Sequence, residues 1–186
     1  MEQFVIEGGY PLSGTVRPAG NKNSAQAVLA ATLLTDGEVV LKNVPSIGDI
    51  ACICDILRDL NVEVRETGPH ELSVCARSLN KTALRADLCA KVRGGFMFSG
   101  PLLARHGRAT VPRPGGDKIG RRGVDTHLKA LEDLGARIQT NHIYEMRAPR
   151  GLQGTDIFLE ERSVTGTENT VMAATLARGT TVIRNA

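Results

Sequence analysis

Residues 103–111 read LARHGRATV, and the chain contains this pattern three times in slightly different form. The other copies are LTDGEVVL at residues 34–41 and LARGTTVI at residues 176–183. In each copy an apolar helical pattern stops at a glycine and a strand pattern follows. The glycines are 70 and 72 residues apart, at Gly37, Gly107 and Gly179.

A second pair of matching stretches has a similar spacing. LRDLNVEV at residues 57–64 resembles LEDLGARI at residues 131–138, 74 residues later. A period this regular indicates a supersecondary unit of about 70 residues, used twice in full and begun a third time. We therefore predict an α/β domain with pseudo-threefold symmetry, its helices inside and its third unit incomplete. Such a third unit should leave apolar surface uncovered, unless another chain, another subunit or a further segment covers it.

The sequence before the first unit predicts two short strands and then a buried helix. The strands lie within residues 3–17, and the helix follows over residues 24–34 with Asn21 or Asn23 as its N-cap. Lys22 then stands at a helix start, where a cation is unfavourable unless the lysine and the free N–H groups share an anion. A solvated surface lysine is the simpler alternative.

Composition excludes several classes of function. The chain has 186 residues, of which 41% are hydrophobic and 23% charged, as in a globular protein. A net charge of +3, 3% aromatic residues and no tryptophan disfavour nucleic-acid binding. There is neither a run of about 18 apolar residues nor the layout of a signal peptide, so we expect a cytoplasmic protein that does not bind a membrane.

The cysteines and histidines predict no metal site. The cysteines form no CxxC pair and lie in apolar or amphipathic contexts, so buried free thiols are favoured over a zinc site or disulfides. The histidines are widely spaced or lie in a polar loop. These residues are Cys52, Cys54, Cys75 and Cys89, and His70, His106, His127 and His142.

Residues 112–127, PRPGGDKIGRRGVDTH, have the composition of an anion site. A Pro/Gly turn places Asp117 among four cations, and an amphipathic helix pattern begins at Val124. The first N–H groups of that helix would face the same place. A basic surface loop before an ordinary helix is the alternative. The cations are Arg113, Lys118, Arg121 and Arg122.

Five motifs in this order resemble the UDP-N-acetylglucosamine 1-carboxyvinyltransferases, which transfer enolpyruvate from phosphoenolpyruvate in the first committed step of peptidoglycan synthesis. The resemblance implies a transferase with a role in the cell wall, and through it in cell shape and division. The motifs are GNKNSA (20–25), KVRGGF with SGPLLAR (91–105), PGGDKIGRRGVDTHL (114–128), LEDLGA (131–136) and SVTGTENTVMAATLARGTTVIRNA (163–186).

Members of that family are more than twice as long and have two similar domains, each an inside-out barrel of three βαβαββ units, with the active site between them. By this resemblance, residues 1–21 are opening strands that belong to the second domain. Residues 22–186 are the first domain, truncated in its third repeat. The carboxylate that accepts the proton of the sugar hydroxyl lies in the family's second half, so this chain would supply one wall of the site. The complementary half, or self-association, would complete it.

The resemblance also assigns residues. Phosphoenolpyruvate and UDP-N-acetylglucosamine are the implied ligands, with no cofactor and no metal. Asp117 and Lys22 match catalytic positions. The substrate-binding positions are Lys22 and Asn23 for phosphoenolpyruvate, Arg93 and Arg122 as cationic ligands, Gly123, Val124, Asp125 and Thr126 for the UDP-sugar, and Ser163 and Val164 for the nucleotide.

Two positions depart from the family pattern. Asp117 stands where many members have a cysteine that protonates the methylene carbon of phosphoenolpyruvate. An isolated aspartate has a pKa of about 3.9 and a thiol one of about 8.5. Asp117 is therefore expected to act as an acid only in the closed, substrate-loaded state, and to be indifferent to thiol-alkylating epoxides such as fosfomycin. Gly94-Gly95 stands where bulkier residues such as Ala-Ser are expected.

The sequence leaves alternative functions open. The first is an enolpyruvyl transferase that is active only with its other half. The second is a module that binds the UDP-sugar or phosphoenolpyruvate without turnover, or a truncated remnant. The third is the sister transferase of the shikimate pathway, which the UDP-sugar motif RRGVDTH at residues 121–127 disfavours.

Overall fold

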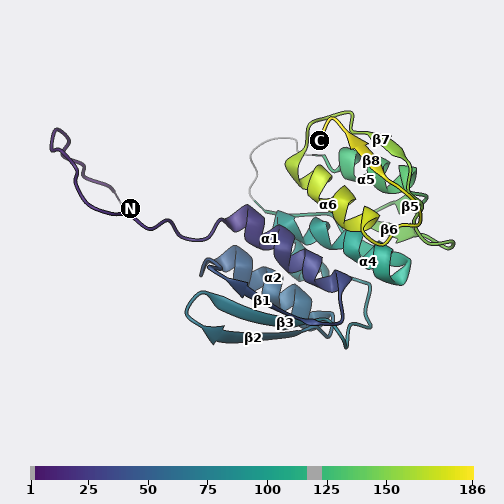
Figure 1. The fold of residues 1–186 in the computed structure, drawn as a ribbon, viewed down its shortest axis with the longest axis horizontal. Coiled ribbons are helices and arrows are strands. Elements are labelled where there is room, and N and C mark those ends of the chain that lie inside the picture. The colour runs from purple at the N-terminus through teal and green to yellow at the C-terminus, as the bar shows by residue number, and fades with distance from the viewer. Residues whose placement is uncertain (1–2, 117–122) are drawn as a thin grey trace.

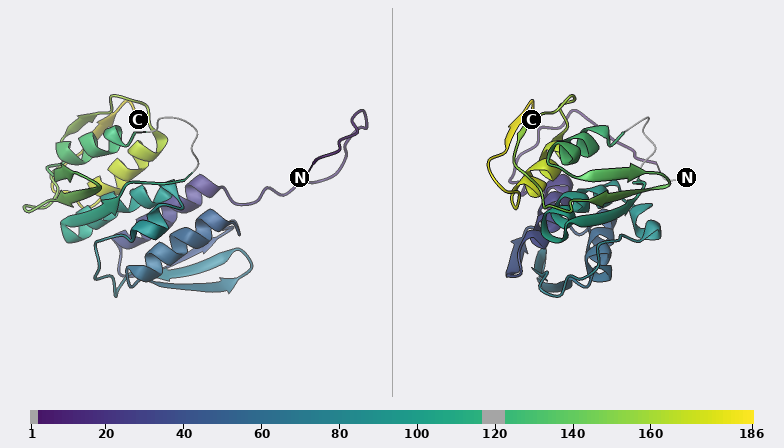
Figure 2. Two further views of the ribbon diagram at one scale, coloured as in Figure 1. Left: turned by 180° about the vertical axis from the view of Figure 1, so that it is seen from behind. Right: turned by 90° about the vertical axis from the view of Figure 1, so that its right-hand side faces the viewer.

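The computed structural model describes residues 3–116 and 123–186. Residues 3–21 form neither helix nor strand and extend away from the body as an arm (Figures 1 and 2). The prediction of two strands within residues 3–17 is therefore wrong for this structure. A strand needs a partner for its backbone groups. The arm pairs with no strand in the described part of the chain, and its Phe4 and Leu12 are 96% and 98% exposed.

The first unit has the order helix, strand, helix and strand, and a further strand then closes a hairpin. Its antiparallel sheet has the order β1-β3-β2, with Glu38 of β1 and Glu63 of β2 both opposite Cys75 of β3. The elements are α1 (Lys22–Ala31), η1 (Thr32–Leu34), β1 (Glu38–Lys42), α2 (Gly48–Asp59), β2 (Glu63–Gly68) and β3 (Glu71–Cys75).

The second unit repeats this arrangement. Its sheet has the corresponding order β4-β6-β5, with Arg108 of β4 and Arg137 of β5 both opposite Arg147 of β6. The sequence repeat thus corresponds to a repeated unit of structure. The elements are α3 (Ala86–Cys89), η2 (Arg93–Phe98), α4 (Ser99–His106), β4 (Arg108–Pro112), α5 (Asp125–Asp133), β5 (Arg137–Thr140) and β6 (Ile143–Arg147).

The third stretch has the order strand, helix, strand, with β7 (Asp156–Phe158) parallel to β8 (Val182–Arg184) and α6 (Val164–Ala174) between them in sequence. The predicted uncovered apolar surface is present here, because Phe158, Val171 and Leu176 are 62%, 50% and 45% exposed.

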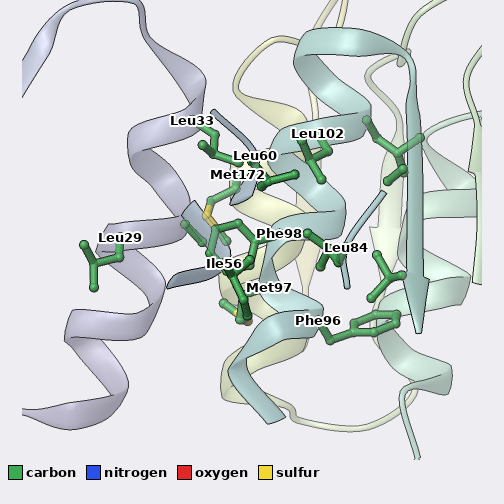
Figure 3. Packing of buried hydrophobic residues seen from close by; sticks show 14 of the residues in the cluster. Leu29, Leu33, Ile56, Leu60, Leu84, Phe96, Met97, Phe98, Leu102 and Met172 are labelled. Carbon is green, nitrogen blue, oxygen red and sulfur yellow. The ribbon is translucent and has the colours of Figure 1, made fainter. Parts of the chain in front are cut away.

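The helices lie in the middle of the body, and the strands lie towards its outside (Figures 1 and 2). α6 packs against α1, α4 and α5, and α1 packs against α2 and η2. One core joins the units, and it includes Leu29 of α1, Leu33 of η1, Phe98 of η2 and Leu102 of α4 (Figure 3). This arrangement is an α/β fold, as predicted. None of the helices in residues 3–116 and 123–186 combines the length and the hydrophobicity that crossing a membrane requires.

Because one core serves both units, we predict a single cooperative unfolding transition in urea. Leu57→Ala and Leu131→Ala each empty a fully buried position and should lower the free energy of unfolding by about 2–5 kcal/mol. Val16→Ala in the exposed arm is the control and should change it by less than about 0.5 kcal/mol. Two separate transitions would show that the units fold independently.

Candidate active site

Lys22 and Asn23 are the first residues of α1. Asn21 is the N-cap, and its side chain accepts a hydrogen bond of 2.9 Å from the backbone N–H of Ser24. The Lys22 ammonium lies 3.0 Å from a carboxylate oxygen of Asp49, in the first turn of α2. The sequence indicated that a lysine here is unfavourable unless it shares an anion with the helix N–H groups, and left a solvated lysine as the alternative. It did not identify Asp49 as a partner.

Arg93 is the first residue of η2, and it lies close to both Gly116 and Gly123. Its guanidinium donates a hydrogen bond of 2.7 Å to the carbonyl oxygen of Gly123, at the start of the predicted UDP-sugar segment. A Cβ built on Gly116 would lie 3.2 Å from the backbone nitrogen of Arg93, so the end of the Pro/Gly turn is also close. Arg93 is thus fixed between the two ends of the 117–122 segment.

Asp117, Lys118, Arg121 and Arg122 lie outside the described residues, and their predicted roles remain predictions. The Pro/Gly turn before them is fixed, because Gly115 and Gly116 donate backbone hydrogen bonds of 2.9 and 3.3 Å to the carbonyls of Cys89 and Ala90. A side chain on Gly115 would overlap the backbone of Ala90, which explains the glycine there.

The predicted UDP-sugar residues lie at the starts of two neighbouring helices. Val124 is buried, while Asp125 and Thr126 open α5. Ser163 is the N-cap of α6, with its hydroxyl accepting a 3.0 Å hydrogen bond from the Gly166 N–H, and Val164 is exposed beside it. The methyl group of Thr126 would lie 3.2 Å from a Cβ on Gly166. The structure thus brings segments 123–126 and 163–164 together.

A buried network behind these helix starts was not predicted. Asn169 of α6 is fully buried, and its side-chain oxygen accepts a hydrogen bond from the backbone N–H of Gly100 at 2.9 Å. Its amide nitrogen must then donate to Ser99 Oγ at 2.9 Å and to His127 Nδ1 at 3.2 Å. His127 Nε2 therefore carries the hydrogen and donates to Thr165 Oγ1 at 3.2 Å. The network joins α4, α5 and α6.

The environment of His127 keeps its imidazole neutral. The ring is 5% exposed and makes an edge-to-face contact with Phe96, with ring centroids 5.2 Å apart. Burial, and secondly the positive charge of Arg93, lower the pKa of His127 from 6.5 to about 4. Both ring nitrogens of His127 have hydrogen-bond partners within the protein, so the ring links α5 to α6. Among the described residues, no group of three or more His, Cys, Asp or Glu side chains is placed to hold a metal ion.

The four cysteines carry free thiols. Cys52, Cys54 and Cys89 are buried as predicted, whereas Cys75 is half-buried. Burial, and secondly the neighbouring Cys52, raise the pKa of the Cys89 thiol to about 12. Although Cys89 accepts a hydrogen bond from the Pro/Gly turn through its carbonyl, its thiol is protonated at neutral pH. Because Cys89 is buried, its thiol is not exposed to a ligand.

A hollow of about 470 Å³ lies elsewhere, between the start of α2 and the β2–β3 hairpin, with Arg58, Glu66 and His70 in its lining. None of the predicted site residues within 3–116 and 123–186 lines it. The predicted site is instead an open surface at the starts of α1, η2, α5 and α6, and α1 and α6 begin on the side of the body from which the arm extends (Figure 1). Helix N–H groups beside Lys22 and Arg93 suit anionic ligands such as phosphates.

Solved structures of enolpyruvyl transferases share this fold. The structure of the enolpyruvyl transferase NikO from Streptomyces tendae matches 95% of this chain and 41% of that chain, with a TM-score of 0.78 at 20% sequence identity. EPSP synthase from Acinetobacter baumannii matches 91% of this chain and 40% of its own, with a TM-score of 0.73 at 18% identity. The fold is therefore that of the enolpyruvyl transferases.

The chain belongs to the EPSP synthase (3-phosphoshikimate 1-carboxyvinyltransferase) family, whose model matches residues 6–186. It is also 46% identical to UDP-N-acetylglucosamine 1-carboxyvinyltransferase of Bradyrhizobium diazoefficiens over 184 residues, which are 99% of this chain and 42% of that protein. The protein of the same name from Helicobacter pylori strain J99 is 46% identical over 187 residues, covering all of this chain and 44% of that protein. The chain thus spans less than half the length of these relatives.

The lowered pKa of His127 predicts acid sensitivity. The unfolded chain binds this proton below about pH 6.5 and the folded chain only near pH 4, so stability is lost as the pH falls through this window. The loss reaches about 3 kcal/mol. In urea titrations between pH 7.5 and 4.5, the free energy of unfolding of His127→Gln should change less with pH than that of the parent chain. Leu131→Ala is destabilised without loss of a titrating group, so its free energy of unfolding should change with pH as steeply as that of the parent. An unchanged slope in His127→Gln would refute the assignment.

Proposed function

We propose that this chain is part of an enzyme that transfers enolpyruvate from phosphoenolpyruvate to the 3-hydroxyl of UDP-N-acetylglucosamine, and that it supplies one wall of the active site. The observation that carries the proposal is the convergence of Lys22, Arg93, residues 123–126 and residues 163–164 at neighbouring helix starts. The matched family includes shikimate enzymes. The names of the 46% identical relatives favour the UDP-sugar as the acceptor.

Each part of this surface has a role that follows from its charge. Lys22 with Asn23 would bind the phosphate or carboxylate of phosphoenolpyruvate, and the N–H groups at the starts of α5 and α6 would face the diphosphate of the nucleotide. Arg93 would fix the UDP-sugar segment through its contact with Gly123, and we assign Arg122 as a second cationic ligand.

In the chemistry that we propose, Asp117 gives its proton to the methylene carbon of phosphoenolpyruvate. The sugar hydroxyl then attacks the resulting cationic carbon, and its proton would pass to a carboxylate outside this chain. Phosphate would leave the tetrahedral intermediate, and the new methyl group would lose one proton to the Asp117 carboxylate, which restores the carbon–carbon double bond of the enolpyruvyl group. The chain's own contribution is therefore to hold both anionic substrates and to supply the acid.

The domain organisation that we propose follows from the repeat. Residues 22–186 would form an inside-out barrel of βαβαββ units with pseudo-threefold symmetry, incomplete in its third unit. Residues 1–21 would add strands to a second domain, which accounts for the exposed apolar side chains of the arm. The complementary half or a second copy would cover the exposed face of the third unit. We place the enzyme in the cytoplasm, where it would serve peptidoglycan synthesis and thereby cell shape and division.

A second candidate function is a binding module without turnover, because fixed cations beside helix N–H groups suit the binding of anions whether or not a reaction follows. Titration calorimetry with UDP-N-acetylglucosamine, followed by an assay of phosphate release from phosphoenolpyruvate, separates the two. Binding with release indicates the enzyme, and binding without release indicates the module. Absence of binding would contradict both.

We predict that Arg93→Gln weakens UDP-N-acetylglucosamine binding about tenfold or more, because it removes a charge-assisted hydrogen bond that fixes the loop. Arg137→Gln on β5 is the matched control and should bind as the parent does. Equal affinities of the parent and Arg93→Gln in calorimetry would remove Arg93 from the site.

The proposed acid is tested in the complete enzyme, this chain together with a second domain. Asp117→Asn should lower kcat at least about 100-fold, because an amide cannot donate the proton in the transition state. The parent should form no covalent adduct with fosfomycin in a mass spectrum, and Asp117→Cys should form one. Full kcat in Asp117→Asn, or an adduct on Asp117 itself, would contradict this role.

A further inference from the structure

Lys22 and Gln26 both reach the same carboxylate. They are four residues apart on α1 and therefore lie on one face of the helix. The Lys22 ammonium lies 3.0 Å from Asp49 Oδ2, and the Gln26 amide nitrogen donates to the same oxygen at 3.4 Å. Asp49 thus fixes two side chains of α1 from the start of α2.

Gly94 provides the space that Gln26 occupies. A Cβ built on Gly94 would lie 2.5 Å from the side-chain oxygen of Gln26 and 2.8 Å from its amide carbon. A residue such as the alanine expected at this position would push the amide away from where it meets Asp49. Gly95 lies against Cys89 instead, with a Cβ-to-sulfur distance of 3.3 Å. The glycine at position 94, where the family pattern has a bulkier residue, therefore leaves room for the side chain of Gln26.

Electrostatics explain why Lys22 needs such a support. A cation at a helix start is unfavourable, whereas a carboxylate in the first turn of α2 is favourable. The Lys22 and Asp49 side chains are 48% and 41% exposed, so the ion pair adds little to stability. Its effect is to restrict a long, flexible side chain to one direction. An ammonium group has three N–H donors, and Asp49 requires one of them.

We propose that Asp49 and Gln26 are positioning residues for Lys22, made possible by Gly94. They hold the ammonium at the start of α1, with donors left for the phosphate or carboxylate of the substrate. This inference rests on the proposed function for the identity of that anion. The orientation of Lys22 itself does not depend on it. Ordering Lys22 before the ligand arrives lowers the entropy that binding would otherwise lose.

The first test measures the order of the Lys22 side chain by NMR relaxation of its Cε and Nζ groups in the ligand-free 186-residue chain. Asp49→Asn and Gly94→Ala should make the ammonium more mobile, and Asp49→Glu should restore most of the order. Asp55→Asn is the matched control, because Asp55 pairs with Arg58 on the outside of the same helix. Equal mobility of Lys22 in the parent and Asp49→Asn would overturn the inference.

A double-mutant cycle tests the role of Gly94. Gly94→Ala should increase Lys22 mobility and weaken phosphoenolpyruvate binding about threefold to tenfold when Gln26 is present, and should add no loss in the Gln26→Ala background. Equal effects in both backgrounds would show that Gly94 acts through another contact. If the variants change the order of Lys22 but phosphoenolpyruvate binds to none of the proteins, the proposed function fails and the positioning stands. If phosphoenolpyruvate binds equally well to all variants, the positioning fails.

Discussion

The arrangement of the site depends on the hydrogen bonds of the buried Asn169 side chain. This side chain satisfies one backbone donor of α4, one hydroxyl of α4 and one imidazole nitrogen of α5, all from α6. A buried amide that lost these partners would carry a large desolvation cost, so the three helices have one register relative to one another. The close approach also requires Gly100, where a Cβ would lie 2.5 Å from the Asn169 carbonyl oxygen.

This register fixes the candidate site. His127 directly follows the predicted UDP-sugar residues, and Thr165 follows the predicted nucleotide contact, so the hydrogen bond between them holds the two segments side by side. Arg93 attaches the start of η2 to the same place through Gly123. Lys22 joins from α1, oriented by Asp49. An anion site of this kind uses helix starts and two fixed cations.

The sequence repeat predicted the alternation of helix and strand, because periodicity is a local property, whereas the candidate site residues came from the family resemblance. The sequence could not predict Asp49, Gln26, His127 or Asn169 as partners, since these contacts join residues that are 23 to 70 positions apart. The prediction of strands within residues 3–17 was wrong because strand formation also depends on a partner that is distant in the sequence. Their apolar residues are a local signal, but a strand forms only beside a partner, and the described residues provide none.

The central claim is that the starts of α1, η2, α5 and α6 form one anion-binding surface. Mapping of backbone amide chemical shifts during titration with UDP-N-acetylglucosamine tests it most directly. The account predicts that the largest changes among the described residues fall in segments 123–127 and 163–166 and at Arg93. Changes centred on the hollow between α2 and the β2–β3 hairpin, around Ser46 and His70, would contradict it.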